Sequence, residues 1–361
     1  MKPLNFSIIL AVLASWLLSA CTAVPASSET LPAAAQVTAA AATFTTVSSR
    51  TLSATAMPTL TPQPTNTPTV RPSPAPMPSL SPVPTETSSA LRDCPCGIKH
   101  VVIISIDGLR PDAIEQTDTP TLDALQAQGA YQPAAQAVLP SVTLVNHASM
   151  LSGLSPAKHG IYWNSNQPDL GKIKGPTLFS VAHEAGLSST MVVGKPKLEH
   201  LVLPGSVDNF VYAGFTDRQV VIEAMDVIRE RMPDLLFIHL PDVDSAGHSV
   251  GWMSPGQLLA VSLTDRLIGE VIAALEAQGY LADTLLIISA DHGGSGFRHG
   301  SDSPEDMTIP WLAVDPGVPA GVTLTSPIVT YDTAATALYA LRIPIPAEWD
   351  GQPVTEIFEQ E

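Results

Sequence analysis

Short apolar runs rich in β-branched residues recur from residue 100 onward, and they predict buried strands. Three such runs, each leading into an aspartate, lie at 100–106, 235–238 and 285–290. Continuous apolar runs are typical of parallel strands that are covered on both faces of a sheet. Two further short strands are expected at 189–193 and 311–314.

Helical patterns lie between and after these strands, at 119–128, 176–185, 217–231, 254–278 and 331–340. Ser254 followed by Pro255 is a favourable helix start, because the hydroxyl can cap the helix and proline fits its first position. Alternating strands and helices predict an α/β fold, a three-layer sandwich with a mostly parallel central sheet. Ligands bind beyond the carboxyl ends of such strands, so the aspartates that follow the three runs are expected to share one site.

The first residues have the pattern of a secretory signal. Lys2 gives a positive start, and the apolar run 6–18 is too short to span a membrane. The end of this segment, Leu18-Ser19-Ala20-Cys21, resembles a bacterial lipobox, in which the cysteine is lipidated. Residues 1–21 are therefore predicted to be a lipoprotein-type signal peptide of a bacterium, with Cys21 as the lipidation site. The alternative is an ordinary signal peptide and a secreted protein. The lipid would anchor the protein to a membrane outside the cytoplasm without spanning it.

Residues 22–92 are rich in Pro, Thr, Ser and Ala and carry few charges, which predicts a disordered stalk. The folded catalytic domain is then expected at 93–361. Cys94 and Cys96 have no second cysteine pair that would complete a zinc site, and no catalytic role is expected for them. The net charge of −17 argues against binding of nucleic acid through its backbone. It does not exclude a small phosphate ester, because bound metal ions reverse the local sign.

The stretch 239–251 places Asp244 and His248 four residues apart among small residues. A carboxylate and an imidazole at this spacing can meet on one divalent cation. An aspartate at a strand end often only caps the following helix. Aspartates at the ends of three strands, Asp107, Asp244 and Asp291, favour a shared metal site instead.

Five motifs, in this order, resemble the alkaline phosphatase superfamily, and within it the type I phosphodiesterase/nucleotide pyrophosphatase family. They span roughly residues 100–315, which is most of the folded part. The motifs are Asp107-Gly108, Thr143-x-x-Asn146-His147, Gly153-Leu154-x-Pro156 followed by His159-Gly160-Ile161, Asp244-x-x-Gly247-His248, and Asp291-His292-Gly293-Gly294 followed by His299-Gly300. The resemblance implies an alkaline phosphatase-like fold.

The resemblance also implies two divalent metal ions, expected to be zinc, with Thr143 as the nucleophile. Asn164 matches the asparagine that binds a phosphate oxygen together with a backbone N–H, here that of Leu144. A threonine hydroxyl is a poor nucleophile near neutral pH unless a metal lowers its pKa, and a second metal can stabilise the opposite oxygen of an in-line displacement. The residues that match the metal ligands are Asp107, Thr143, Asp291 and His292 for one ion and Asp244, His248 and His299 for the other.

The function implied is hydrolysis of phosphodiester or nucleotide pyrophosphate bonds through a covalent phospho-threonine. A phosphomonoesterase or a phosphonate hydrolase on the same site remains open. No arginine lies in the Thr143 motif or close after it to meet a second phosphoryl charge, so a diester is expected to be preferred. A sulfatase is not expected, because the chain has no Cys/Ser-x-Pro-x-Arg segment. No long insertion separates the ligand motifs, so no large cap domain is expected.

Two alternatives belong to other classes. Gly247-His248-Ser249-Val250-Gly251 fits the nucleophile elbow of serine esterases with the α/β-hydrolase fold. That elbow needs a strand directly before its first glycine, and here the polar segment 242–246 intervenes, while Pro255 delays the next helix. A tethered, non-catalytic metal-binding protein is the other alternative, and the intact Thr143 with its full ligand set counts against it.

Several polar residues near the motifs are expected to have structural roles. His147 and His159 are expected to be structural or to support the ligands, and His239 and Asp242 match no ligand position. Lys195 and Lys197 could touch a substrate, but a solvated loop is the expectation for them.

Overall fold

The computed structural model describes residues 97–358. The predicted signal peptide, the predicted stalk at 22–92, Cys21, Cys94 and Cys96 lie outside the described residues. Within 97–358, no helix combines the length and the apolar character that crossing a membrane requires.

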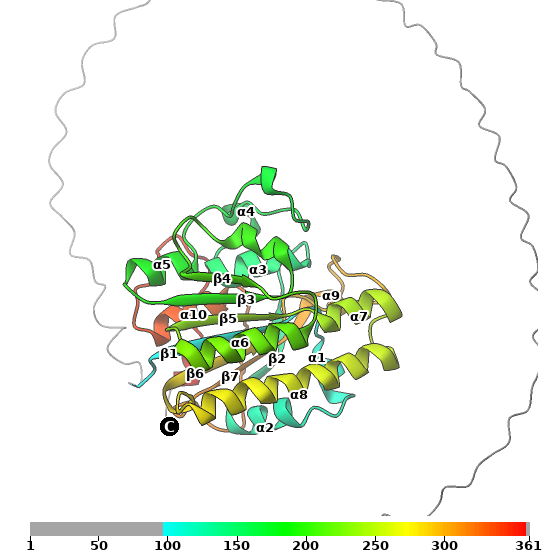
Figure 1. The fold of residues 1–361 in the computed structure, drawn as a ribbon. Coiled ribbons are helices and arrows are strands. Elements are labelled where there is room, and N and C mark those ends of the chain that lie inside the picture. The colour runs from blue at the N-terminus through cyan, green and yellow to red at the C-terminus, as the bar shows by residue number, and fades with distance from the viewer. Residues whose placement is uncertain (1–96, 359–361) are drawn as a thin grey trace, which may run out of the picture. The chain divides into compact units, whose positions relative to one another are not determined.

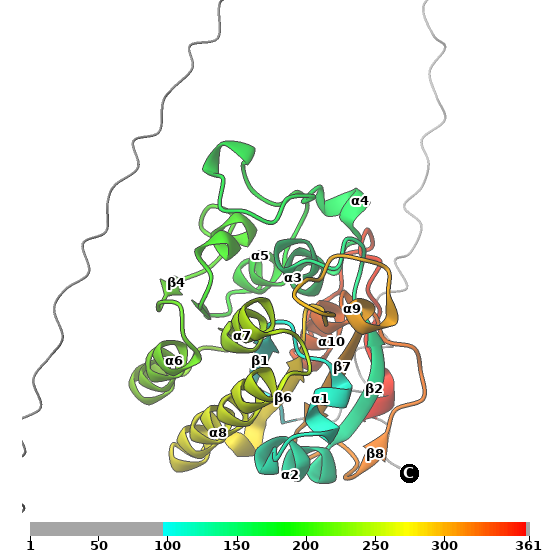
Figure 2. The same ribbon diagram turned by 90° about the vertical axis from the view of Figure 1, so that its right-hand side faces the viewer.

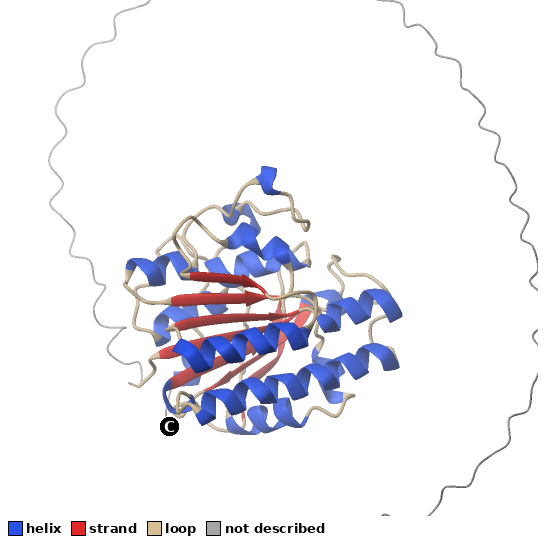
Figure 3. Cartoon of the chain, viewed as in Figure 1, coloured by secondary structure: helices blue, strands red, loops and turns tan. Residues whose placement is uncertain are grey.

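One eight-stranded sheet forms the centre of the described part of the chain (Figure 3). Its strand order is β4-β3-β5-β1-β6-β7-β2-β8. The five strands from β4 to β6 run parallel, whereas β7 is antiparallel to both of its neighbours. The predicted mostly parallel sheet is therefore confirmed. The strands are β1 His100–Ile106, β2 Ala130–Gln136, β3 Ser189–Val193, β4 Asn209–Tyr212, β5 Leu235–Leu240, β6 Thr284–Ser289, β7 Thr308–Val314 and β8 Val322–Thr323.

Helices cover both faces of this sheet. Helices α2, α6 and α8 lie together on one face, and α3, α5 and α10 cover the other (Figures 1 and 2). This arrangement is the predicted three-layer sandwich. The helices are α1 Pro111–Glu115, α2 Pro120–Gln128, α3 Thr143–Ser152, α4 Pro156–His159, α5 Leu178–Glu184, α6 Asp217–Arg231, α7 Asp242–Val250, α8 Pro255–Ala277, α9 Pro304–Met307 and α10 Asp332–Ala340. Short 3-10 segments are η2 Pro168–Leu170, η3 Pro196–Leu201, η4 Leu281–Asp283 and η5 Thr355–Phe358.

The five predicted helices are present, and their ends agree to within two residues. Helix α8 begins at Pro255, and the Ser254 hydroxyl accepts a hydrogen bond from the Gln257 N–H at 3.3 Å, as the capping pattern predicts. Two helices that carry site residues, α3 and α7, were not foreseen. Helix α7 occupies the polar segment that the sequence suggested was a connection between strand and helix.

The three strands that lead into aspartates are neighbours at the centre of the sheet, in the order β5-β1-β6. Their registers place Ser105 of β1 opposite His239 of β5 and Ser289 of β6, so the three carboxyl ends lie level with one another. Every residue of these three strands except His100 is buried. The expectation that their aspartates meet at one edge is therefore confirmed.

The start of α7 is fixed by a pair of aspartates rather than by a side-chain cap of its own. The Asp217 carboxylate accepts from the Asp242 N–H at 2.9 Å, and the Asp242 carboxylate accepts from the Asp217 N–H at 3.1 Å. Thr264 of α8 donates its hydroxyl to Asp217. Burial, together with the neighbouring Asp242 carboxylate, raises the pKa of Asp217 to about 7. Asp242 thus aligns the first turn of α7, two residues before Asp244.

Candidate active site

The first cluster of predicted ligands lies beyond β1 and β6. Asp107, Asp291 and His292 are fully buried, and one ligand atom of each lies within 4.8 Å of the others. The His292 Nε2 atom is 3.3 Å from the Asp291 Oδ2 atom and 3.5 Å from the Asp107 Oδ1 atom. This cluster, named group 1 here, has the size and the donor set of a site for one divalent ion.

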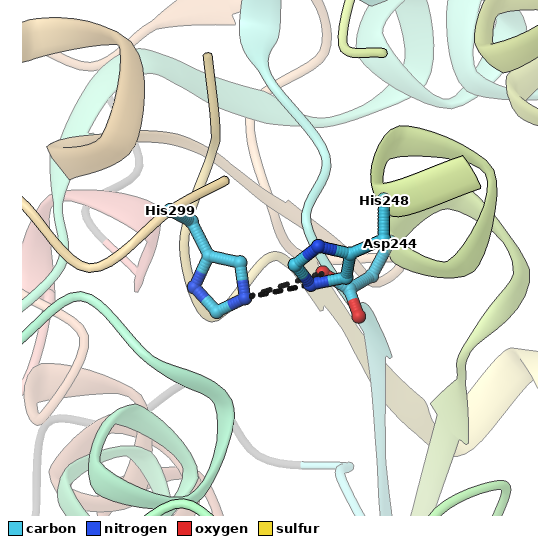
Figure 4. Close-up of side chains that lie close together, drawn as sticks. All are labelled: Asp244, His248 and His299. Atoms are coloured by element: carbon cyan, nitrogen blue, oxygen red, sulfur yellow. Dashed lines mark hydrogen bonds and ion pairs between the residues drawn. The ribbon is translucent and has the colours of Figure 1, made fainter. Parts of the chain in front are cut away.

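The second cluster, named group 2, consists of Asp244, His248 and His299 (Figure 4). Asp244 and His248 lie one turn apart on α7, while His299 comes from the loop before α9. The Nε2 atoms of the two histidines are 3.1 Å apart, and they lie 3.4 and 3.6 Å from the Asp244 Oδ1 atom. The rings of His292 and His299 stack with their centroids 3.8 Å apart, so the two groups form one continuous site.

Each of the three aspartates has one oxygen engaged by the protein and one left without a hydrogen-bond donor. Asp107 Oδ2 accepts from His239 Nε2 at 2.9 Å, and Asp291 Oδ1 accepts from the Gly108 N–H at 3.1 Å. Asp244 Oδ2 accepts from Lys195 Nζ at 2.5 Å. The other oxygens, Asp107 Oδ1, Asp291 Oδ2 and Asp244 Oδ1, are buried and have no hydrogen-bond partner among residues 97–358. A buried carboxylate oxygen without a donor is costly, so these three atoms fit a bound cation.

The three histidines are oriented as metal ligands are. The Nδ1 atoms of His248, His292 and His299 each lie 2.8–3.0 Å from a backbone carbonyl oxygen. A carbonyl can only accept, so each Nδ1 carries the proton and each Nε2 keeps its lone pair. A backbone partner of this kind fixes the ring of a metal-ligating histidine. Two lone pairs 3.1 Å apart, as on His248 and His299, repel each other unless a cation lies between them.

The protonation states agree with this donor set. Burial lowers the pKa of His292, and burial together with the neighbouring His292 ring lowers the pKa of His299 to about 4. Both rings are therefore neutral at pH 7, the form that binds metal. Burial alone would raise the pKa of the Asp107 carboxyl, but the Lys195 ammonium and the His239 hydrogen bond hold that pKa well below its usual range.

Gly108 and Trp252 allow the two groups to approach, and Trp252 was not foreseen from the sequence. Gly108 adopts φ 75°, and a Cβ atom there would lie 3.0 Å from the Asp244 Cα and Cβ atoms. A larger residue would push α7 away from β1. The Trp252 indole N–H donates to the Gly108 carbonyl at 2.9 Å, and its ring contacts His248 at a centroid distance of 5.1 Å.

Thr143 is the first residue of α3, and its side chain is fully buried beside group 1. The Thr143 Oγ1 atom lies 3.4 Å from the His292 Nε2 atom. The next backbone N–H, that of Leu144, donates to Asn164 Oδ1 at 2.9 Å. The structure therefore brings Thr143, Leu144 and Asn164 together beside the ligand groups. A helix N-terminus with free N–H groups is suited to an anion such as a phosphoryl group.

The expectation of a solvated loop for Lys195 and Lys197 is wrong. The Lys195 Nζ atom lies 2.7 Å from Asp107 Oδ2 and 2.5 Å from Asp244 Oδ2, and it therefore joins the two groups. The Lys197 Nζ atom lies 2.8 Å from Asn164 Oδ1. Both lysines follow β3, which pairs with β5, so the tertiary structure carries them to the same sheet edge. The only sequence signal was a pair of cations directly after a buried strand.

The remaining histidines near the motifs have supporting roles. His239 donates to Asp107, as described above, and His147 bonds to the Thr143 carbonyl and the Ser105 hydroxyl, each at 2.8 Å. His159 contacts the Ser149 hydroxyl and the Ile161 N–H, away from either group. None of the three belongs to group 1 or group 2.

The serine elbow is absent. Gly247 and Ser249 both lie inside helix α7, and the Ser249 hydroxyl donates to the Ser245 carbonyl at 2.7 Å. The polar segment 242–246, which the sequence places between the strand and Gly247, forms the first part of helix α7. The conclusion against an elbow stands, because an elbow needs a sharp turn between a strand and a helix at the serine.

Solved structures share this fold. An inactive threonine-to-alanine variant of murine ectonucleotide pyrophosphatase / phosphodiesterase 5, in complex with AMP, matches with a TM-score of 0.63 and 16% sequence identity. The match covers 72% of this chain and 100% of that one. A 2-O GAG sulfatase matches with a TM-score of 0.60 and 16% identity, over 72% of this chain and 74% of the sulfatase. These likenesses confirm the alkaline phosphatase-like fold.

Sequence relatives point to one family. An uncharacterized pyrophosphatase/phosphodiesterase of Schizosaccharomyces pombe is 28% identical over 214 residues, which are 54% of this chain and 44% of that relative. A venom phosphodiesterase of Macrovipera lebetinus is 26% identical over 231 residues, 57% of this chain and 27% of that enzyme. The chain thus spans less than half the length of these relatives. The family model for type I phosphodiesterase / nucleotide pyrophosphatase matches residues 101–304, more than half of the chain. This chain therefore belongs to the type I phosphodiesterase/nucleotide pyrophosphatase family.

Proposed function

We propose that this chain is a phosphoric ester hydrolase that cleaves phosphodiester or nucleotide pyrophosphate bonds, with Thr143 as its nucleophile. The observation that carries the proposal is the buried Thr143 hydroxyl beside group 1, with group 2 stacked against it. Family membership supports the same reaction, because the relatives are named as phosphodiesterases and pyrophosphatases. The AMP bound to the murine structural neighbour agrees with a nucleotide substrate.

Two divalent ions fit the donor set, and zinc suits it best because half of the six Asp and His side chains are imidazoles. Asp107, Asp291 and His292 would hold one ion with the Thr143 oxygen, and group 2 would hold the other. Bound ions would lower the pKa of the Thr143 hydroxyl and offset the charge on the phosphoryl oxygens.

The chain's own residues then position the reacting groups. Helix α3 fixes the Thr143 oxygen, since the Thr143 carbonyl is tied to His147 and the helix is buried along its whole length. The Leu144 N–H, which lies 2.9 Å from the Asn164 side-chain oxygen, and the Asn164 amide would bind a non-bridging oxygen. The Thr143 oxygen would bond to phosphorus as the leaving oxygen departs, and water would then hydrolyse the phospho-threonine.

Aryl esters give the direct test of this function. The purified protein is expected to release p-nitrophenol from a p-nitrophenyl phosphodiester and to cleave a nucleotide p-nitrophenyl ester. Cleavage of an aryl carboxyl ester with no turnover of either phosphate ester would contradict the proposal.

We also propose that the protein works outside the cytoplasm on a lipid anchor at Cys21. The observation behind this is the lipobox-like tetrapeptide, and relatives named as ectonucleotide or venom enzymes agree with an extracytoplasmic site. In a bacterial host, Cys21→Ser is expected to move the protein from the membrane fraction to a soluble fraction and to stop incorporation of labelled palmitate. Membrane retention of that variant, without label in the wild type, would contradict the anchor.

A further inference from the structure

Lys197 lies beside the oxygen-binding groups, although it belongs to none of the family motifs quoted above. Strand β3 ends at Val193, and Lys197 lies in the first turn of η3. Because β3 pairs with β5, the start of η3 lies at the same sheet edge as group 2. The Lys197 Nζ atom donates to the Asn164 side-chain oxygen at 2.8 Å.

Two donors therefore meet at one oxygen. The Leu144 N–H and the Lys197 ammonium both donate to Asn164 Oδ1, at 2.9 and 2.8 Å. A backbone N–H at a helix start and an ammonium group form the kind of donor pair that binds an anionic oxygen. A phosphoryl oxygen near Thr143 would lie within reach of both donors.

The two lysines differ in how their charge is neutralised. Lys195 pairs with the carboxylates of Asp107 and Asp244. Within residues 97–358, Lys197 makes no ion pair with a carboxylate, and its hydrogen bonds go to Asn164, which is neutral. A half-buried ammonium without a counter-ion is unfavourable, and a substrate anion would supply the missing charge.

This cation changes the expected substrate range. The preference for a diester assumed that only Asn164 and a backbone N–H meet the phosphoryl oxygens. A diester carries one negative charge on its non-bridging oxygens, whereas a monoester dianion carries two. Lys197 adds a cation beside Asn164 and that N–H. The preference for a diester stays a prediction.

We propose that Lys197 is a specificity-determining residue that binds the second negative charge of a dianionic phosphoryl group, so that this site accepts phosphate monoesters as well as diesters. The proposal rests on the proposed function of the site, because it concerns which esters that site takes. A role limited to positioning Asn164 is the competing account. The two accounts differ, because a misplaced Asn164 would weaken binding of both esters equally.

The test compares two substrates with the same leaving group, p-nitrophenyl phosphate and methyl p-nitrophenyl phosphate, on Lys197→Gln and Lys197→Arg. For Lys197→Gln, kcat/KM for the monoester is expected to fall about 10- to 100-fold, as for loss of a hydrogen bond to a charged group, and the diester value less than about threefold. Lys197→Arg is expected to recover most of the monoester activity, because it restores the charge. Equal losses for the two esters in Lys197→Gln, or no loss at all, would overturn the proposal.

Lys99→Gln is the matched control for loss of one positive charge. Lys99 precedes β1, at the opposite edge of the sheet from the site, and its exposed ammonium pairs with Asp283 at 2.7 Å. The kcat/KM values of Lys99→Gln for the monoester and the diester are expected to match those of the wild type. A selective monoester loss in Lys99→Gln as well would assign the effect to overall charge and would overturn the role of Lys197.

A binding measurement separates this proposal from the proposed function. Inorganic phosphate, titrated calorimetrically at pH 7 into the metal-loaded wild type and Lys197→Gln, is expected to bind about tenfold more weakly to the variant. If the wild type cleaves neither ester, the proposed function fails, and the phosphate titration still decides what Lys197 binds. Equal phosphate affinities of wild type and variant would overturn the proposal whatever the activity.

Discussion

Thr143→Ala is expected to lower phosphodiester turnover by about three orders of magnitude or more while the protein keeps its metal ions. The change removes the attacking oxygen and thus the whole covalent route, and it leaves all six Asp and His side chains of the two groups in place. Helix α3 should persist, because its start has no side-chain cap to lose. The measurements are kcat on an aryl phosphodiester and metal content by elemental analysis. Full activity of the variant would end the assignment of Thr143 as nucleophile.

Ser249→Ala is the matched control, because it removes a hydroxyl from the neighbourhood of a ligand without touching the proposed chemistry. Within the described part of the chain, the Ser249 hydroxyl bonds only to the Ser245 carbonyl one turn back. Such a bond contributes roughly 1 kcal/mol, so a loss of about tenfold or less is expected. A serine esterase would show the reverse pattern: an inactive Ser249→Ala, a nearly normal Thr143→Ala, and cleavage of carboxyl esters that chelators do not inhibit.

Removal of divalent ions is expected to abolish activity, and zinc is expected to restore it better than magnesium. The physical reason is the donor set, in which three imidazoles with free Nε2 lone pairs face three carboxylate oxygens that lack donors. Magnesium prefers oxygen ligands, whereas zinc accepts imidazole nitrogen. Prolonged dialysis against a chelator, followed by titration with each metal, gives the measurement.

Metal content provides an activity-independent check. The wild type is expected to hold about two ions per chain, one for each group, as a two-metal phosphoryl-transfer site requires. His248→Ala removes one ligand of group 2 and leaves group 1 intact, so it should hold about one ion fewer. Fewer than about one ion per chain in active wild type would refute the two-metal proposal.

The sequence alone determined the layout of the fold. The apolar runs at 100–106, 235–238 and 285–290 correspond to β1, β5 and β6, because strands buried on both faces are continuously apolar, and these runs are short and rich in β-branched residues. Because the carboxyl ends of parallel strands lie at one edge of a sheet, the polar residues that follow these runs were expected at that edge. Strands away from the centre of the sheet gave weaker signals: β2, which lies between β7 and β8, contains Pro133 and is only partly buried, and it was not foreseen.

The sequence also identified the ligand candidates of groups 1 and 2, because their motifs follow one another along the chain in the same order as in the family. It did not determine the local structure that carries them. The segment 242–250 is small and polar, and it is helical because Asp217 and Asp242 pair their carboxylates with each other's backbone N–H groups. That pairing joins two segments 25 residues apart, which a local pattern cannot show.

Only the tertiary structure decided the role of the lysines. Lys195 and Lys197 lie in a short polar segment that looks like any solvated loop, and nothing local tells a solvated cation from a buried one. Their surroundings depend on the pairing of β3 with β5, which places the end of β3 next to Asp107, Asp244 and Asn164. The partners of Lys195 and Lys197 are 33 to 88 residues distant along the chain, so strand order, rather than sequence pattern, turns these two cations into part of the site.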